Sequence, residues 1–200
     1  MRGALLCLTI LFVSTACSTI APPPTRENIS WQAHQHQVAQ LQYWTITGRL
    51  AVSHGSESWN LDVLWQQQGD AYFIKLTGPL GAGQIQLRGD QDGVVLEDGE
   101  HHPQYAENPD SLLYDNTGLK IPVNGMRFWV RGLPAPQMHE DSRALVAGRL
   151  TQLHQAGWQL QFRRYQQVKT TVLPQKLFMQ RGDLEVRLMI DQWQLGLPNS

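Results

Sequence analysis

The chain has 200 residues, which is enough for one ordinary domain with a sizeable hydrophobic core. Its 16 Lys and Arg nearly balance its 17 Asp and Glu, and only 16% of the residues are charged. The sequence therefore lacks the basic surface that nucleic-acid binding needs, and we expect no nucleic-acid partner. Both cysteines, Cys7 and Cys17, lie in the first seventeen residues, so the rest of the chain holds neither a disulfide nor a cysteine-ligated metal.

The N-terminus has the three parts of a secretory signal. A charged start is followed by an apolar run, residues 3–13, by the small residues 14–16 and then by Cys17. The run is shorter than the roughly 20 apolar residues that span a bilayer. A cysteine directly after small residues resembles the lipobox of bacterial lipoproteins, although Ser14 stands where a lipobox usually has Leu. The resemblance implies a signal peptide over residues 1–16 and an S-diacylglycerol and an N-acyl group on Cys17; the alternative is a secreted protein with an unmodified cysteine.

Residues 17–30 contain three consecutive prolines and few apolar side chains, which favours an extended tether between the lipidated cysteine and a single domain over residues 31–200. The resemblance to bacterial lipoproteins also implies sorting to the outer membrane, because Ser18 and not Asp follows the cysteine. The domain begins with apolar or aromatic residues at helical spacing, which predict an amphipathic helix over residues 31–42.

Strands dominate the rest of the domain. Apolar and polar residues alternate in eight stretches: residues 44–52, 59–66, 72–76, 85–87, 94–96, 158–162, 177–179 and 184–190. Turn sequences such as Asp92-Gly93 and Asp98-Gly99 separate them at hairpin spacing, which indicates that neighbouring strands pair in an antiparallel meander. We therefore expect a mainly β (α+β) fold in which one curved antiparallel sheet forms an incomplete β-barrel.

Two segments interrupt the strand pattern and favour short helices. Residues 108–116 have Asp110 as a candidate N-cap, and residues 123–131 have Asn124 as a candidate N-cap. Gly132-Leu133-Pro134 is a helix stop signal. Because the apolar face of a large sheet must be covered, we expect these helices and the N-terminal one to form a lid over it.

The sequence offers little for catalysis or metal binding. His34 and His36 stand two apart on a predicted helix and so face different sides, which does not suit a shared metal. No Gly-x-Ser-x-Gly nucleophile motif occurs. The glycine-rich stretch 78–83 lacks the Lys-Ser/Thr of a phosphate-binding loop and precedes a strand. We therefore expect no catalytic residues, no metal and no cofactor apart from the lipid on Cys17.

The same stretch is unusual for a hairpin turn because its tip is apolar. Pro79 and Gly81 flank Leu80. One arrangement folds this loop back so that Leu80 joins the core; the other leaves Leu80 exposed for contact with lipid or a partner. We expect the exposed arrangement, with Pro79, Leu80 and Gly81 forming a membrane-insertion loop.

Several motifs occur together in one order along the chain. They are the lipobox, the proline-rich tether, Thr47-Gly48-Arg49, the stretch 76–81 (LTGPLG), the stretch 128–134 (FWVRGLP) and the stretch 189–193 (MIDQW). Together they resemble the outer-membrane lipoprotein LolB family over roughly residues 31–193. The resemblance implies a curved sheet closed by helices around an apolar cavity, and a lipid-anchored, non-enzymatic receptor at the outer membrane whose domain faces the periplasm. It also implies that such a receptor takes lipoproteins from the periplasmic carrier LolA and inserts them into the membrane.

On this interpretation, apolar side chains of the sheet and lid hold the acyl chains of the cargo. The candidates are Leu50, Val52, Trp59, Leu61, Val63, Trp65, Phe128, Trp129, Leu160 and Phe162. Alternation alone does not separate residues that line a cavity from residues that pack the lid. The expected partners are LolA, lipoprotein acyl chains and outer-membrane phospholipid, and the domain is expected to be a monomer. Two other functions remain open here: a structural lipoprotein of an envelope assembly complex, and a lipid hydrolase.

Overall fold

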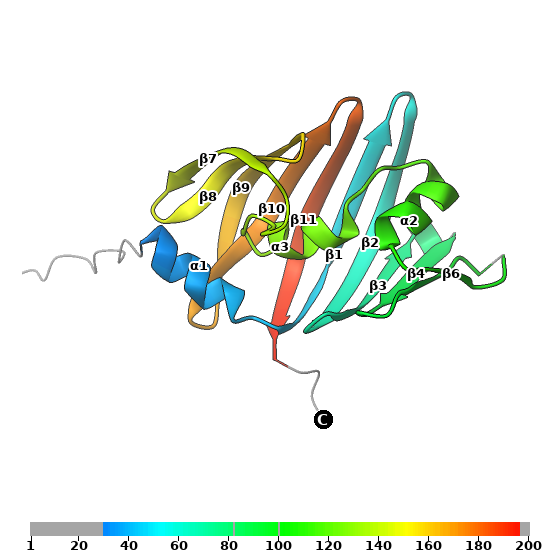
Figure 1. Cartoon of the computed structure of the whole chain (residues 1–200), viewed down its shortest axis with the longest axis horizontal. Coiled ribbons are helices and arrows are strands. Elements are labelled where there is room, and N and C mark those ends of the chain that lie inside the picture. Colours follow the sequence, from blue (N-terminus) through cyan, green and yellow to red (C-terminus); the bar gives the residue numbers. More distant parts are fainter. Residues whose placement is uncertain (1–29, 82, 100, 197–200) are drawn as a thin grey trace, which may run out of the picture.

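One curved antiparallel sheet with helices on its inner side makes up the protein (Figure 1). The computed structural model describes residues 30–81, 83–99 and 101–196. Three α-helices and a short 3₁₀ turn accompany the strands: α1 (Trp31–Ala39), η1 (Pro79–Gly81), α2 (Pro109–Thr117) and α3 (Val123–Trp129). The strands are β1 (Tyr43–His54), β2 (Glu57–Gln68), β3 (Ala71–Thr77), β4 (Gln84–Gly89), β5 (Val94–Glu97), β6 (Gln104–Ala106), β7 (Glu140–Val146), β8 (Arg149–Gln155), β9 (Trp158–Val168), β10 (Thr171–Arg181) and β11 (Leu184–Leu195).

The sheet consists of two meanders that join where the first strand meets the last. Its eleven strands have the order β6-β5-β4-β3-β2-β1-β11-β10-β9-β8-β7, and all neighbouring strands among the described residues pair antiparallel. The edge strands β6 and β7 stand at opposite ends of this order, and α2 and α3 lie in the chain between them. The predicted open, curved antiparallel sheet is therefore confirmed.

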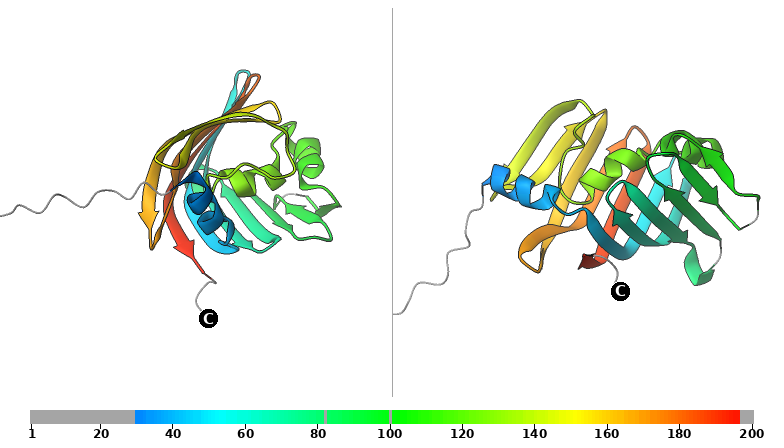
Figure 2. Two further views of the ribbon diagram at one scale, coloured as in Figure 1. Left: turned by 60° about the vertical axis from the view of Figure 1, so that its left-hand side comes forward. Right: turned by 60° about the horizontal axis from the view of Figure 1, so that its bottom comes forward.

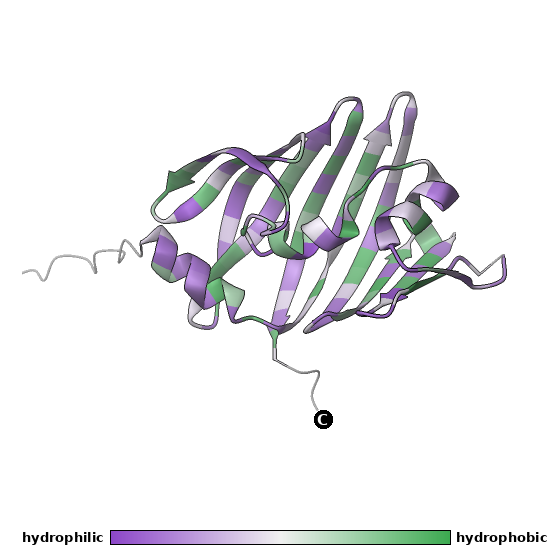
Figure 3. Ribbon diagram, viewed as in Figure 1, coloured by the Kyte–Doolittle hydropathy of each residue, from purple (hydrophilic) through white to green (hydrophobic). Residues whose placement is uncertain are grey.

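Alternation along most of the strands gives the sheet one apolar face. On β1, Trp44, Ile46, Leu50 and Val52 are buried, whereas the residues between them, apart from Gly48, are half-buried or exposed. Figure 3 shows the same alternation as bands of apolar and polar residues along the strands. The apolar side chains point to the concave side, which we call the inner face, and the alternate side chains form the outer face.

The seam between β1 and β11 depends on Gly48. The register shifts between Thr47 and Gly48, so that Asp191 of β11 has no opposite residue on β1. A Cβ atom at position 48 would lie 2.1 Å from the carbonyl oxygen of Met189. Only a residue without a side chain permits this close backbone approach, which occurs at a β-bulge that bends the sheet.

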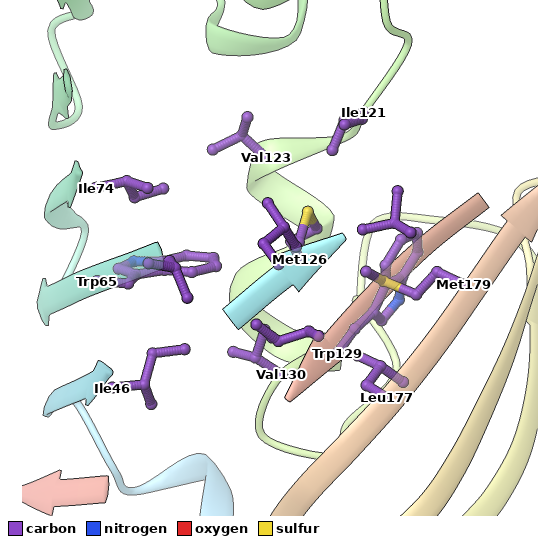
Figure 4. Close-up of a cluster of buried hydrophobic side chains, with 14 of the residues drawn as sticks. Ile46, Trp65, Ile74, Ile121, Val123, Met126, Trp129, Val130, Leu177 and Met179 are labelled. Carbon is purple, nitrogen blue, oxygen red and sulfur yellow. The ribbon is translucent and has the colours of Figure 1, made fainter. Parts of the chain in front are cut away.

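The helices lie within the curve of the sheet, as both views in Figure 2 show. In Figure 4, Met126, Trp129 and Val130 point from α3 and its C-cap into the space between the two halves of the sheet. They meet Ile46 and Trp65 from one side and Leu177 and Met179 from the other. Trp129 and Val130 are 0% exposed. The predicted helical cover over the apolar face is therefore present.

Some of the predicted boundaries and caps are wrong. The first helix ends at Ala39 rather than at residue 42, because Gln40 is its C-cap. Asn108, not Asp110, caps α2: its side chain accepts a hydrogen bond from Asp110 N–H, and Pro109 occupies the first helical position. Asn124 lies inside α3, whose N-cap is Pro122 without a side-chain hydrogen bond.

Three strands, β6, β7 and β8, were not predicted. No helix within the described residues is long and apolar enough to cross a membrane.

Candidate functional site: an apolar interior and an exposed leucine loop

The space between the inner face and α3 is filled by buried apolar side chains. Seven of the ten predicted acyl-chain residues are buried in it: Leu50, Val52, Val63, Trp65, Trp129, Leu160 and Phe162. Rings of Trp44, Trp65 and Trp193 pack on one another with centroids 5.3 and 5.5 Å apart. The α3 side chains fill the middle of this space, so acyl chains enter it only if α3 shifts.

Towards one end of β2 the inner face becomes accessible to water. Trp59 and Leu61 point to the same side as Val63, but Trp59 is 37% exposed and Leu61 is half-buried. Leu76 of β3 pairs with Val63, and Ile85 of β4 pairs with Leu76; both are also half-buried. We call Trp59, Leu61, Leu76 and Ile85 the apolar rim. It continues the apolar interior to the surface.

Phe128 lies at the margin of the apolar interior. Its half-buried ring packs against the buried core, and two guanidinium groups approach it, with Arg127 4.9 Å and Arg131 5.3 Å from the ring centroid. Its neighbour Trp129 is the residue that enters the interior. Adjacent helix residues differ by about 100° in direction, so Trp129 is fully buried while Phe128 stays partly exposed at the edge of the interior.

Buried hydrogen bonds hold the end of α3 in place. Trp129 Nε1 donates to Gln155 Oε1 at 2.8 Å, and Gln155 is itself 1% exposed. The Gln155 side chain also accepts from Ala135 N–H at 2.9 Å and donates to the carbonyl oxygens of Ala135 and Met138. Gln155 thus connects α3 and the loop after it to the end of β8.

Arg131 connects the same segment to the other side of the molecule. Its guanidinium donates to the carbonyl oxygens of Leu41 and Arg127, both at 2.9 Å. Burial, with a smaller contribution from Arg127, lowers the pKa of Arg131 to about 10. The side chain therefore remains charged at neutral pH, and it attaches the end of α3 to the turn between α1 and β1.

The start of α3 is fixed by α2. Asp110 Oδ1 accepts a hydrogen bond from Val123 N–H at 2.8 Å, which supplies the cap that Pro122 lacks. Burial raises the pKa of Asp110, while the backbone N–H groups of Val123 and Asn124 act in the opposite direction. Burial of the Tyr72 side chain likewise raises its pKa to about 12.

None of the described His, Cys, Asp and Glu residues form a group of three that could hold a metal ion.

The Leu80 loop between β3 and β4 contrasts with this tightly held helix. Leu80 is fully exposed and has a left-handed backbone, with φ 56° and ψ 22°. Gly81 N–H donates to Gly78 O, and Gly78 N–H donates to Gly83 O, both at 3.1 Å. The short loop thus keeps the leucine in water and out of the core, as expected from its flanking Pro79 and Gly81.

The predicted lipid-attachment residue Cys17 and the predicted signal peptide 1–16 lie outside the described residues. Of the predicted tether, 17–30, only Ser30 is described. Its Oγ accepts a hydrogen bond from Ala33 N–H at 3.2 Å and caps α1. The tether thus ends at a helix N-cap.

Comparison with known proteins decides the family. The model of the family "Outer membrane lipoprotein LolB" matches residues 42–193, which include the whole sheet except the last two residues of β11. The chain belongs to the LolB family. LolB from Nitrosococcus oceani is 33% identical over 197 residues, covering 98% of both chains. LolB from Chromohalobacter salexigens is 36% identical over 192 residues, covering 94% of this chain and 88% of the relative.

Solved structures show the fold. A LolA superfamily protein from Nitrosomonas europaea matches with a TM-score of 0.57 at 7% identity, covering 85% of this chain and 96% of its own. As a LolB-family member, the protein is an outer-membrane lipoprotein of the Lol pathway with its domain on the periplasmic side, and it is not an enzyme. Membership also implies LolA and lipoprotein cargo as partners.

Proposed function

We propose that the protein receives lipoproteins from LolA, holds their acyl chains in its apolar interior and inserts them into the outer membrane. The observation that carries this proposal is the combination of an apolar interior that reaches the surface at Trp59 with a loop that holds Leu80 in water. An acyl chain left in water is unfavourable by about 0.8 kcal/mol per methylene, so a receptor must shield the chains during transfer.

In this mechanism α3 acts as the lid. Acyl chains enter over the apolar rim, beginning at Trp59 and Leu61, and displace Trp129 and Val130 from between the two halves of the sheet. The hydrogen bond from Arg131 to Leu41 O then limits how far the end of α3 moves. The direction of transfer follows from relative affinity. The acyl chains pass from LolA to this protein because it binds them more tightly than LolA does, and then to the bilayer because the bilayer binds them more tightly still.

The Leu80 loop supports the release step. A leucine side chain that moves from water into the membrane interface gains roughly 1.5–3 kcal/mol if it becomes fully buried. Since Leu80 is fully exposed, this gain is available without unfolding any part of the domain. Pro79, Leu80 and Gly81 thus bring the protein into contact with outer-membrane phospholipid.

The remaining expectations concern the anchor and the domain. We propose that Cys17 carries diacylglycerol and an N-acyl group after removal of residues 1–16, that residues 17–30 form the tether, and that residues 31–200 form one monomeric domain. Several acyl chains on one cysteine give stable membrane attachment where a single chain does not.

The test is the substitution Leu80→Glu in the reconstituted, acylated protein. We expect unchanged thermal unfolding and normal uptake of cargo from LolA, because the side chain touches nothing in the fold. Delivery of the cargo into liposomes should fall at least tenfold, because a carboxylate does not enter the interface. The control is Leu145→Glu on the edge strand β7, where a 40% exposed leucine should tolerate the charge without loss of delivery.

Two results would count against this role. A melting temperature several degrees below that of the wild type would mean that Leu80 stabilises the fold. Wild-type delivery by a stable Leu80→Glu protein would mean that membrane release depends on another surface.

A further inference from the structure

The outer face of the sheet carries a cluster of positive charges around one phenylalanine. Lys176 Nζ lies 5.2 Å from the ring centroid of Phe178, and the guanidinium carbons of Arg163 and Arg187 each lie 5.7 Å from it. Arg164 is exposed and pairs with Lys176 in the β9–β10 ladder. We call Arg163, Arg164, Lys176 and Arg187 the cationic cluster. Phe178 itself is half-buried.

Most of this charge is not neutralised within the described part of the chain. Arg187 pairs with Glu185 at 2.9 Å, but no carboxylate of the described residues lies within 4 Å of Arg163, Arg164 or Lys176. The guanidinium of Arg163 is instead hydrogen-bonded to the side chain of Gln161. Arg163, Arg164 and Lys176 therefore lie together, where the register of the β9–β10 ladder shifts, and none of them forms an ion pair with a described carboxylate.

A groove of about 440 Å³ runs from this cluster to the Leu80 loop. Ala51, Phe178 and Met189 give it apolar surface, Lys176 and Arg187 lie at one side, and Pro79 lies at the other. Asp62 also lines it, as does Arg49, which is paired with Asp191 at 3.3 Å. The end near β10 is thus positive, and Pro79 joins the groove to Leu80, which is fully exposed.

From this arrangement we propose that the outer face binds the phosphate groups of anionic phospholipids when the Leu80 loop enters the membrane. The inference deepens the proposed function, on which it rests. Lys176 is the unpaired cation that lines the groove, and Arg163 and Arg164 lie beside it in the cationic cluster. A partly apolar groove with such cations next to it is complementary to an anionic amphiphile, whose phosphate and glycerol groups lie beside its hydrocarbon. A membrane is favoured over an acidic protein because Pro79, and with it the Leu80 loop, borders the same groove.

The first measurement is the reactivity of lysines in the acylated protein reconstituted in vesicles. Vesicles of phosphatidylcholine alone are compared with vesicles that contain phosphatidylglycerol, and acetylation of each lysine is measured by mass spectrometry. We expect acetylation of Lys176 to fall several-fold in the anionic vesicles. Lys120 is the matched control, since its Nζ lies at the same 5.2 Å from an aromatic ring, that of Tyr114, but it follows α2 and is not on this face.

The second measurement is cargo delivery by Lys176→Glu, Arg164→Glu and the double variant, with Lys120→Glu as control. Each juxtamembrane cation contributes roughly a fivefold change in binding to an anionic surface, and a glutamate also adds a negative charge, so delivery into anionic vesicles should fall by at least about that factor for each substitution. Delivery into phosphatidylcholine vesicles should stay unchanged. Thermal unfolding of each variant, and the milder Lys176→Gln if the glutamate variant is unstable, separate this effect from misfolding.

The proposal is overturned if Lys176 reacts equally in both kinds of vesicle, or if the substitutions slow delivery equally into both. It is also overturned if LolA protects Lys176 without vesicles, because the face would then bind the carrier. The proposed function is judged separately: loss of delivery in Leu80→Glu alongside normal delivery by the cluster variants would retain the receptor and reject lipid binding on this face.

Discussion

At the scale of single residues, Leu80 combines two features that do not help the protein fold. Its left-handed backbone is unfavourable for a residue with a side chain by roughly 1–2 kcal/mol, and the side chain stays in water. We propose that such a residue acts through what it contacts outside the domain. Its surroundings in the sequence predicted its exposure because Pro79 and Gly81 leave a short turn without space for packing.

We therefore expect Leu80→Gly to separate stability from activity. Glycine adopts the same backbone without strain, so the free energy of unfolding should stay unchanged or rise by up to about 1 kcal/mol. Delivery into liposomes should nevertheless fall, since the apolar side chain is gone. The matched control is Ala147→Gly, at φ 48° in the β7–β8 turn, which should give a similar change in stability with normal delivery. A clear loss of stability in Leu80→Gly would contradict this account.

The buried side chain of His34 should make the stability of the domain depend on pH. It is 2% exposed, its Nε2 has no hydrogen-bond partner among the described residues, and burial, followed by Arg149, lowers its pKa. Below about pH 6.5 the unfolded chain binds a proton that folded His34 does not, so stability is full above that pH and falls as the pH is lowered. The loss is up to about 1.4 kcal/mol per pH unit until the folded pKa is reached.

Urea unfolding at pH 7.5 and 5.5 measures this effect. His34→Gln should reduce the difference between the two free energies, whereas His36→Gln, on the exposed side of α1, should leave it as in the wild type. An equal reduction in both variants would show that burial of His34 is not the cause.

At the scale of elements, α3 depends on a cap that comes from another helix. Asp110→Ala removes the acceptor of Val123 N–H and should destabilise the domain by about 1 kcal/mol. Asp110→Asn keeps an oxygen at this position and removes a charge whose burial is unfavourable, so it should be as stable as the wild type. Thermal unfolding of the two variants distinguishes them. Equal destabilisation by both would mean that the negative charge, and not the acceptor, holds α3.

This cap also shows where sequence patterns stop being informative. Local signals located α2 and α3 but predicted the wrong cap for each. For α2 the cap is Asn108, two residues before the predicted one. For α3 the acceptor is thirteen residues away in the chain, where no local signal reaches. Strand β7 was missed because all of its residues are at least partly exposed and it has no apolar alternation. In β8 the alternation breaks between Leu150 and Leu153. Strands with one buried face, such as β1 and β9, were predictable because their period is two.

At the scale of the whole molecule, the antiparallel character and curvature of the sheet were predictable. The pairing of the first strand, β1, with the last strand, β11, was not. Turn sequences specify only neighbours along the chain, whereas β1 and β11 meet across almost the full domain. The same limit applies to the interior. Alternation placed Val63 and Trp65 on the inner face, but only the folded arrangement shows that Trp129 enters the interior while Phe128 remains at its surface.

The central claim is that acyl chains of the cargo occupy the interior between the sheet and α3. Val63 and Leu64 provide the most direct test, since they are adjacent on β2 and point to the inner and outer face, respectively. A photoreactive amino acid is placed at either position, and the protein is irradiated after uptake of acylated cargo from LolA. We predict cross-links from position 63 to the acyl chains, few from position 64, and none from either to cargo without acyl chains. Equal cross-linking from both positions, or cross-linking at position 63 that does not need the acyl chains, would contradict the account.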